Sequence, residues 1–118
     1  MLRQEREDSE MNDTKNLISN AFMTFMSEAP EQAKAWSEMV QGLAKASALD
    51  EKTHSLAYLA VLAALRLESG IPFHIHAAKA AGASRQEVIS AILVGLPAAG
   101  HRVTQVLPAA LAAYDDAS

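Results

Sequence analysis

The sequence contains no cysteine among its 118 residues. A chain without thiols forms no disulfide, offers no thiolate to a metal ion and has no sulfur nucleophile for redox chemistry. Aromatic residues are scarce at 5%, yet half of the residues are apolar and 20% are charged. This composition is typical of a globular protein and not of a disordered one. The length corresponds to one domain with one sizeable core.

An excess of basic residues is also missing. The chain has 10 Lys and Arg against 14 Asp and Glu, a formal net charge of −4. Nucleic-acid binding and adhesion to anionic membranes both need a positively charged surface, so we expect neither partner. The longest apolar run covers residues 56–65 and ends at Arg66, well short of the ~18 residues that a membrane-spanning helix needs. No apolar stretch follows the first basic residues, as it would in a signal peptide. We therefore expect a cytoplasmic protein.

The first twelve residues are polar and charged, and we expect them to form a disordered, solvated tail. Residues 13–118 are expected to form a single all-α domain, because they are rich in strong helix formers and their β-branched residues are too scattered for strands. Glycine-rich phosphate-binding loops are absent, and we expect no cofactor. Apolar periodicity predicts about six helices, over residues 13–27, 30–45, 50–67, 71–81, 85–98 and 103–114.

Several residues mark the expected ends of these helices. Pro30 suits a first helical turn and Asp50 an N-cap. Gly82 is placed to end a helix in the left-handed conformation. Ser84 and Glu87 have the spacing of a capping box, and Pro108 is expected to kink the last helix or to start it anew.

The helix expected over residues 50–67 has almost no polar side. A helix that is apolar all round is buried on all sides. In a chain of this size such burial is easier when subunits associate, so we expect a homo-oligomer.

Histidines are the only side chains whose ordinary pKa lies near neutrality. His74 and His76 would point to one face of a strand and chelate a metal there, but on a helix they point roughly 200° apart. The alanine-rich segment after them favours the helix, so we expect no metal site. An inward-facing imidazole is then either a satisfied core residue or a general acid or base. His54 and His101 are interpreted as surface residues.

Glu68 is the carboxylate next to the C-terminal end of the long apolar helix. The helix dipole disfavours a negative charge at that end, which indicates a compensating contact.

The order Leu49-Asp50, His74, Ala78, then Gly82-Ala83-Ser84 with Glu87 is similar to a known family pattern. It resembles the carboxymuconolactone decarboxylase and alkylhydroperoxidase D-like family over about 70 residues. That pattern has a Cys-x-x-Cys turn, a histidine four residues after the second cysteine, and then A-x-x-x-G-A-[ST]-x-x-E. The resemblance implies a helical bundle that assembles into trimers or hexamers, with sites near subunit interfaces.

The chain departs from this pattern at the residues that carry the family's redox chemistry. With His74 aligned, the two cysteine positions fall on Leu67 and Gly70, and the family's glutamate of the proton relay falls on Ser55. Thiol peroxidase activity is therefore not expected.

Two functions stay open at this point. One is implied by the resemblance to the decarboxylase branch of the family: acid–base chemistry at His74 on a small organic acid or lactone, with Glu68 and His76 as candidate helpers. The substrate carboxylate would need a cation, and the candidates are Arg66, Lys79, Arg85 and Arg102. The other is a non-catalytic oligomeric helical scaffold, or a small-ligand binder, that has lost the redox residues.

Overall fold

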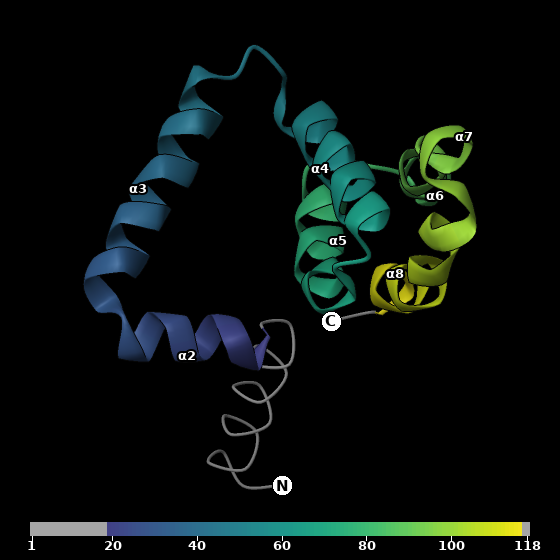
Figure 1. The fold of residues 1–118 in the computed structure, drawn as a ribbon. Helices are drawn as coiled ribbons and strands as arrows, with labels where there is room; N and C mark the ends of the chain where they lie inside the picture. The colour runs from purple at the N-terminus through teal and green to yellow at the C-terminus, as the bar shows by residue number, and fades with distance from the viewer. Residues whose placement is uncertain (1–18, 117–118) are drawn as a thin grey trace, which may run out of the picture. The chain divides into compact units, whose positions relative to one another are not determined.

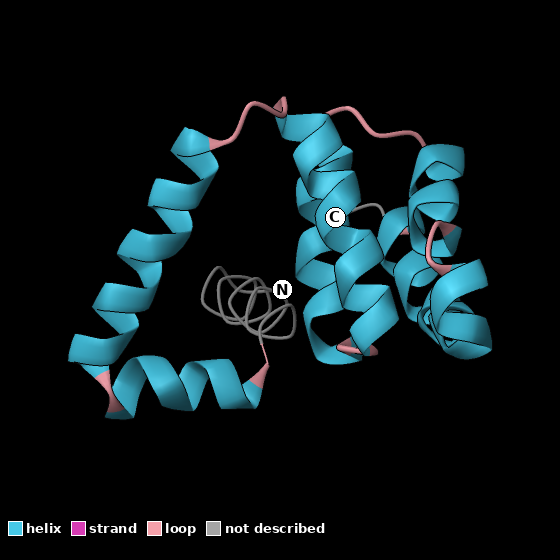
Figure 2. Ribbon diagram, turned by 45° about the horizontal axis from the view of Figure 1, so that its top comes forward, coloured by secondary structure: helices cyan, strands magenta, loops and turns pink. Residues whose placement is uncertain are grey.

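The computed structural model describes residues 19–116, so the expected tail over residues 1–12 lies outside the described part. Every element within residues 19–116 is helical, which confirms the all-α prediction (Figures 1 and 2). The chain divides into two compact units that meet in sequence between Ala48 and Leu49. The expectation of one domain over residues 13–118 stays a prediction.

The first unit, which we call the hairpin, consists of two helices that meet at a wide angle, α2 (Asn20–Glu28) and α3 (Pro30–Ala46) (Figure 1). Ser19 caps α2 by accepting a hydrogen bond from the Phe22 backbone N–H at 3.1 Å, and Pro30 occupies the first turn of α3 as predicted. Three aromatic rings hold the two helices together by edge-to-face contacts between Phe22, Phe25 and Trp36. Ala33 is the one buried hydrophobic residue among the described residues of this unit.

The second unit contains the remaining helices. In chain order they are α4 (Glu51–Leu65), a 3-10 turn η1 (Glu68–Gly70), α5 (Ile71–Ala80), α6 (Arg85–Leu93), α7 (Leu96–Ala99), a 3-10 segment η2 (Gly100–Val106) and α8 (Leu107–Asp115). Their apolar sides share one core, in which Leu59, Ile71, Ile75, Ile92 and Val103 are fully buried. Helices α4 and α5 lie side by side in both ribbon views (Figures 1 and 2).

The predicted capping residues do what the sequence indicated. Asp50 accepts a hydrogen bond from the Thr53 N–H at 2.8 Å, and Ser84 and Glu87 form a complete capping box at the start of α6. Gly82 has a φ of 96° and follows the end of α5. Pro108 lies in the first turn of α8, which confirms a restart.

Three helix boundaries differ from the prediction. The helix expected over residues 103–114 begins only at Leu107, because residues 100–106 form the 3-10 segment η2. The helix expected over residues 85–98 stops at Leu93 and restarts at Leu96, because Pro97 has no N–H and its ring clashes with the carbonyl of Leu93 four residues earlier. The helix expected over residues 50–67 ends at Leu65, where Arg66 adopts the left-handed conformation with a φ of 56°. Glu68 therefore lies in the η1 turn and not on α4.

Helix α8 is attached to the turn between α5 and α6 by polar contacts. Arg85 forms a two-pronged ion pair with Asp115, with N–O distances of 2.9 and 3.0 Å. The Tyr114 hydroxyl donates to the Ala83 carbonyl at 2.8 Å, and Lys79 donates to the Tyr114 carbonyl at 2.6 Å. Lys79 and Arg85 thus stabilise the position of α8 against the rest of the second unit.

Candidate functional site

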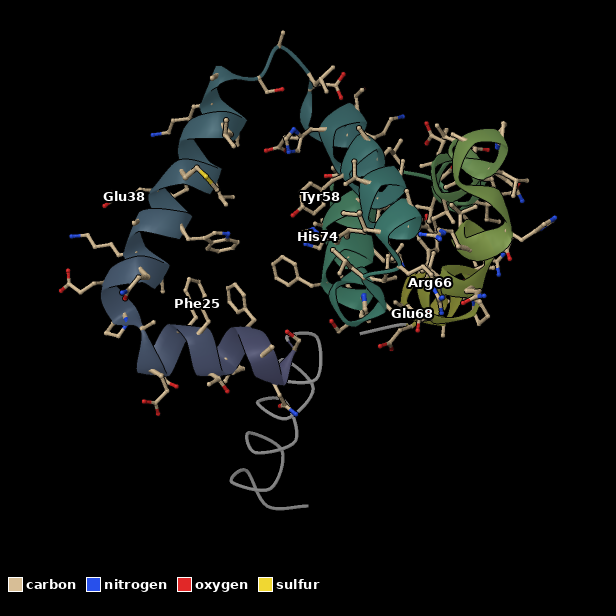
Figure 3. The ribbon with its side chains drawn as sticks, in the orientation of Figure 1. Phe25, Glu38, Tyr58, Arg66, Glu68 and His74 are labelled. Atoms are coloured by element: carbon tan, nitrogen blue, oxygen red, sulfur yellow. The ribbon has the colours of Figure 1, made fainter. Side chains whose placement is uncertain are left out.

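The candidate site surrounds His74 on α5, where its imidazole is half-buried. Its ring centroid lies 4.5 Å from the ring of Tyr58 on α4, at a tilt of 32°. Phe73 meets the same imidazole edge to face at 5.2 Å, and His54 stacks on Tyr58 at 6.4 Å. Figure 3 shows the labelled Tyr58 and His74 next to each other on the same side of α4 and α5.

These rings continue into an exposed apolar surface of α4. Tyr58 and Phe73 keep exposed fractions of 42% and 48%, and Val61 and Leu65 are more exposed still. At about 100° per residue, the α4 members of this surface fall on one arc roughly 60° wide. We call the whole surface the His74 face; it consists of His54, Tyr58, Val61, Leu65, Phe73 and His74.

No charged group balances the His74 imidazole within residues 19–116. Burial lowers the pKa of His74, so the neutral imidazole prevails at pH 7. Neither ring nitrogen has a hydrogen-bond partner in that part of the chain. A neutral imidazole accepts a hydrogen bond or a proton and offers a flat ring for stacking, and these are the interactions that the site provides.

One of the two residues at the family's cysteine positions, Gly70, lies next to this ring. A Cβ atom on Gly70 would lie 3.9 Å from Cδ2 of His74, in ordinary van der Waals contact. Leu67 precedes the same η1 turn and is half-exposed. The local geometry thus agrees with the alignment that puts Gly70 where the second thiol would be.

The candidate helpers of His74 are not brought to its ring. Glu68 is exposed in η1, and Figure 3 shows it near Arg66 and well apart from His74. His76 follows two residues later on α5 and therefore points roughly 200° away from His74. Among the described residues, neither Glu68 nor His76 makes a side-chain hydrogen bond or ion pair.

The alternative of a metal site depended on a strand through His74 and His76. Residues 71–80 form the helix α5 instead. In the part of the chain that the structure describes, no three His, Cys, Asp or Glu side chains gather to hold a metal ion. Within residues 19–116, no helix is long and apolar enough to cross a bilayer.

A concave surface lies between α4 and α6, and neither His74 nor Tyr58 lines it. It is a shallow groove of about 640 Å³ with a floor of Leu56, Ala57, Ala60 and Ala91. Lys52 and Glu87 bridge the two helices at its rim with a salt bridge of 2.9 Å. A small apolar ligand would contact apolar side chains in this groove but few polar groups that could orient it.

Sequence reasoning found His74 but missed the rings that surround it. Tyr58 lies 16 residues earlier on another helix, so spacing along the chain did not connect them. The recurrence of His54, Tyr58, Val61 and Leu65 at helical intervals was the available sign of a second apolar face on α4.

Comparison with known proteins gives one clear result. A family model described as the carboxymuconolactone decarboxylase family matches residues 30–112. A search of curated proteins and a search of solved structures each found no match. The matched range covers more than half of the chain and includes both the η1 turn and His74.

Proposed function

Since the chain belongs to the carboxymuconolactone decarboxylase family, we propose that it is a thiol-independent, non-catalytic homo-oligomeric scaffold of that family. In this proposal the His74 face packs against apolar surface, or stacks on a flat small ligand, and supplies no acid–base pair. The family resemblance favours a trimer or a hexamer.

The observation that carries this proposal is the environment of the His74 imidazole. It contacts the rings of Tyr58 and Phe73, and in the described part of the chain no carboxylate or cation bonds to it. A general acid or base that turns over is normally held and tuned by such a partner. Two of the four cations that might hold a substrate carboxylate, Lys79 and Arg85, are engaged with α8.

A pair of substitutions separates a packing role of His74 from an acid–base role. His74→Phe keeps an aromatic ring and removes the ionisable group, so it should retain the oligomeric mass and lower the melting temperature at pH 7.5 by less than His74→Ala does. His74→Ala removes the ring contacts, worth roughly 1 kcal/mol, and should lower the melting temperature by roughly 4 °C. Differential scanning calorimetry and light scattering measure both effects.

The same variants predict a difference in pH dependence. Because the pKa of His74 is lower in the fold than the ordinary value of 6.5, the unfolded chain binds the proton more tightly. Stability is then fully present above pH 6.5 and falls as the pH drops toward the folded pKa. Between pH 7.5 and 5.5 the wild type should therefore lose more stability than His74→Phe, and equal losses would contradict the assignment of His74 as a buried neutral ring.

A second candidate is acid–base chemistry at His74 on a small organic acid or lactone. The neutral state of the half-exposed imidazole favours it, because a neutral imidazole is competent as a general base at pH 7. In that case the wild type would turn over a lactone acid saturably. His74→Phe would keep mass and melting temperature but abolish the turnover, and this result would overturn the non-catalytic proposal.

A further inference from the structure

The hairpin of the first unit carries an uncovered apolar surface of its own. Trp36 and Leu43 on α3 have exposed fractions of 39% and 63%. We call this surface the hairpin face; it consists of Phe22, Phe25, Trp36, Val40 and Leu43. A pair of helices with one buried residue among those described has no core sufficient to stabilise it alone.

The charges of α3 avoid the hairpin face. At about 100° per residue, Trp36, Val40 and Leu43 share one arc of the helix, and the charged residues lie on the opposite side at Glu31, Lys34, Glu38 and Lys45. Figure 3 shows Glu38 pointing to the side of α3 away from Phe25. The His74 face also contains no Asp, Glu, Lys or Arg. Two uncharged, ring-rich surfaces can meet without leaving an unpaired charge between them.

We propose that the hairpin face of one copy covers the His74 face of a second copy, and that the second copy's hairpin does the same in return. Trp36 of the partner subunit then completes the surroundings of His74. This inference rests on the homo-oligomer proposed above and specifies which surfaces form it.

The polar atoms of the two faces complement each other. The Trp36 indole is a hydrogen-bond donor only, and the neutral His74 imidazole has one acceptor nitrogen. Neither group has a hydrogen-bond partner within residues 19–116. Buried tryptophan and histidine nitrogens are normally paired, and contact between the two faces lets the indole N–H donate to the imidazole.

The available area agrees with a reciprocal pair. The side chains of these faces range from partly to about half exposed and contribute roughly 60–100 Å² each, so each face offers roughly 400 Å². The area that a single face buries against another is therefore smaller than the area of a specific interface. A reciprocal exchange uses both faces of each copy, roughly 800 Å² per partner, which is the usual size of a stable interface.

The connection between the units favours a second copy as the occupant. Ser47 and Asp50 are both extended, with ψ values of 138° and 167°. The link from 47 to 50 contains no glycine and no residue with positive φ. Leu49 within the link is a bend, and a short link of this kind between two helices suits the exchange of an element between copies.

Because the chain has no cysteine, single cysteines can be placed without background. We would label Val40→Cys protein with ¹⁵N, mix it with unlabelled Val61→Cys protein, allow the subunits to exchange and add a short bis-maleimide. The proposal predicts a cross-linked species that contains one copy of each, identified by mass spectrometry. The matched control replaces Val40→Cys with Glu38→Cys, on the charged side of α3, and should give no mixed species.

Three results would overturn the proposal. One is the absence of the mixed species. Another is a Val40→Cys homodimer alone, which would mean that hairpins pair with hairpins. The third is an internal cross-link in the double variant Val40→Cys/Val61→Cys without mixed species, which would mean closure within one chain. The readout does not involve turnover, so a catalytic His74 would overturn the non-catalytic proposal and leave this interface standing.

Discussion

Purified protein is expected to consume no organic hydroperoxide in the presence of a dithiol reductant, at any substrate concentration. The reaction needs a thiolate that attacks the peroxide and breaks the O–O bond, and a second thiol that resolves the sulfenic acid as a disulfide and releases water. Leu67 and Gly70 stand at the two thiol positions and perform neither step. The assay follows hydroperoxide loss with time.

A double substitution serves as the positive control for that prediction. Leu67→Cys/Gly70→Cys restores two thiols on the η1 turn, and the second starts from a Cβ position 3.9 Å from Cδ2 of His74. The glutamate of the family's proton relay is still absent at Ser55, so we expect slow hydroperoxide consumption by this variant and none by either single variant. Saturable turnover by the wild type would contradict the alignment that places these positions.

The largest expected loss of stability comes from the centre of the second unit. Ile75 lies on α5 next to His74 in sequence and is fully buried in the shared core. Ile75→Ala removes buried methyl groups and leaves a cavity, which typically costs about 2–5 kcal/mol of unfolding free energy. Guanidinium melts at a fixed protomer concentration measure this loss, because association itself adds stability.

Val94→Ala is the matched control for Ile75→Ala. Val94 also loses methyl groups, but its side chain is 69% exposed at the end of α6, so the change should stay within about 0.5 kcal/mol. Similar losses at Ile75 and Val94 would mean that the core is not where the structure places it.

The helical class and most helix boundaries could be predicted because their causes are local. Asp50, Ser84 and Pro108 act on backbone groups within a few residues of themselves, so a sequence window contains the whole interaction. The break after Leu93 was missed although its cause, Pro97, was equally local. The apolar periodicity of residues 85–98 was given more weight than the missing N–H of that proline.

The surroundings of His74 depend on contacts between helices, and these have no local cause. The ring of Tyr58 reaches His74 because α4 and α5 pack side by side. Glu68 was a candidate because it follows a long apolar run, but the left-handed Arg66 ends α4 before it. The left-handed turn carries Glu68 into η1, and Figure 3 shows its side chain apart from the imidazole. No property of Arg66 in the sequence indicated that conformation, which glycine adopts far more readily.

The central claim is that this chain closes its apolar faces against copies of itself, and the molar mass in solution tests it most directly. Light scattering on the intact protein over a wide concentration range should give a multiple of the chain mass of 12.6 kDa. A hexamer would agree with the family resemblance, which implies trimers or hexamers. It would also contain an even number of copies, which a reciprocal pairing of hairpins needs. A single species of 12.6 kDa at every concentration would contradict the account.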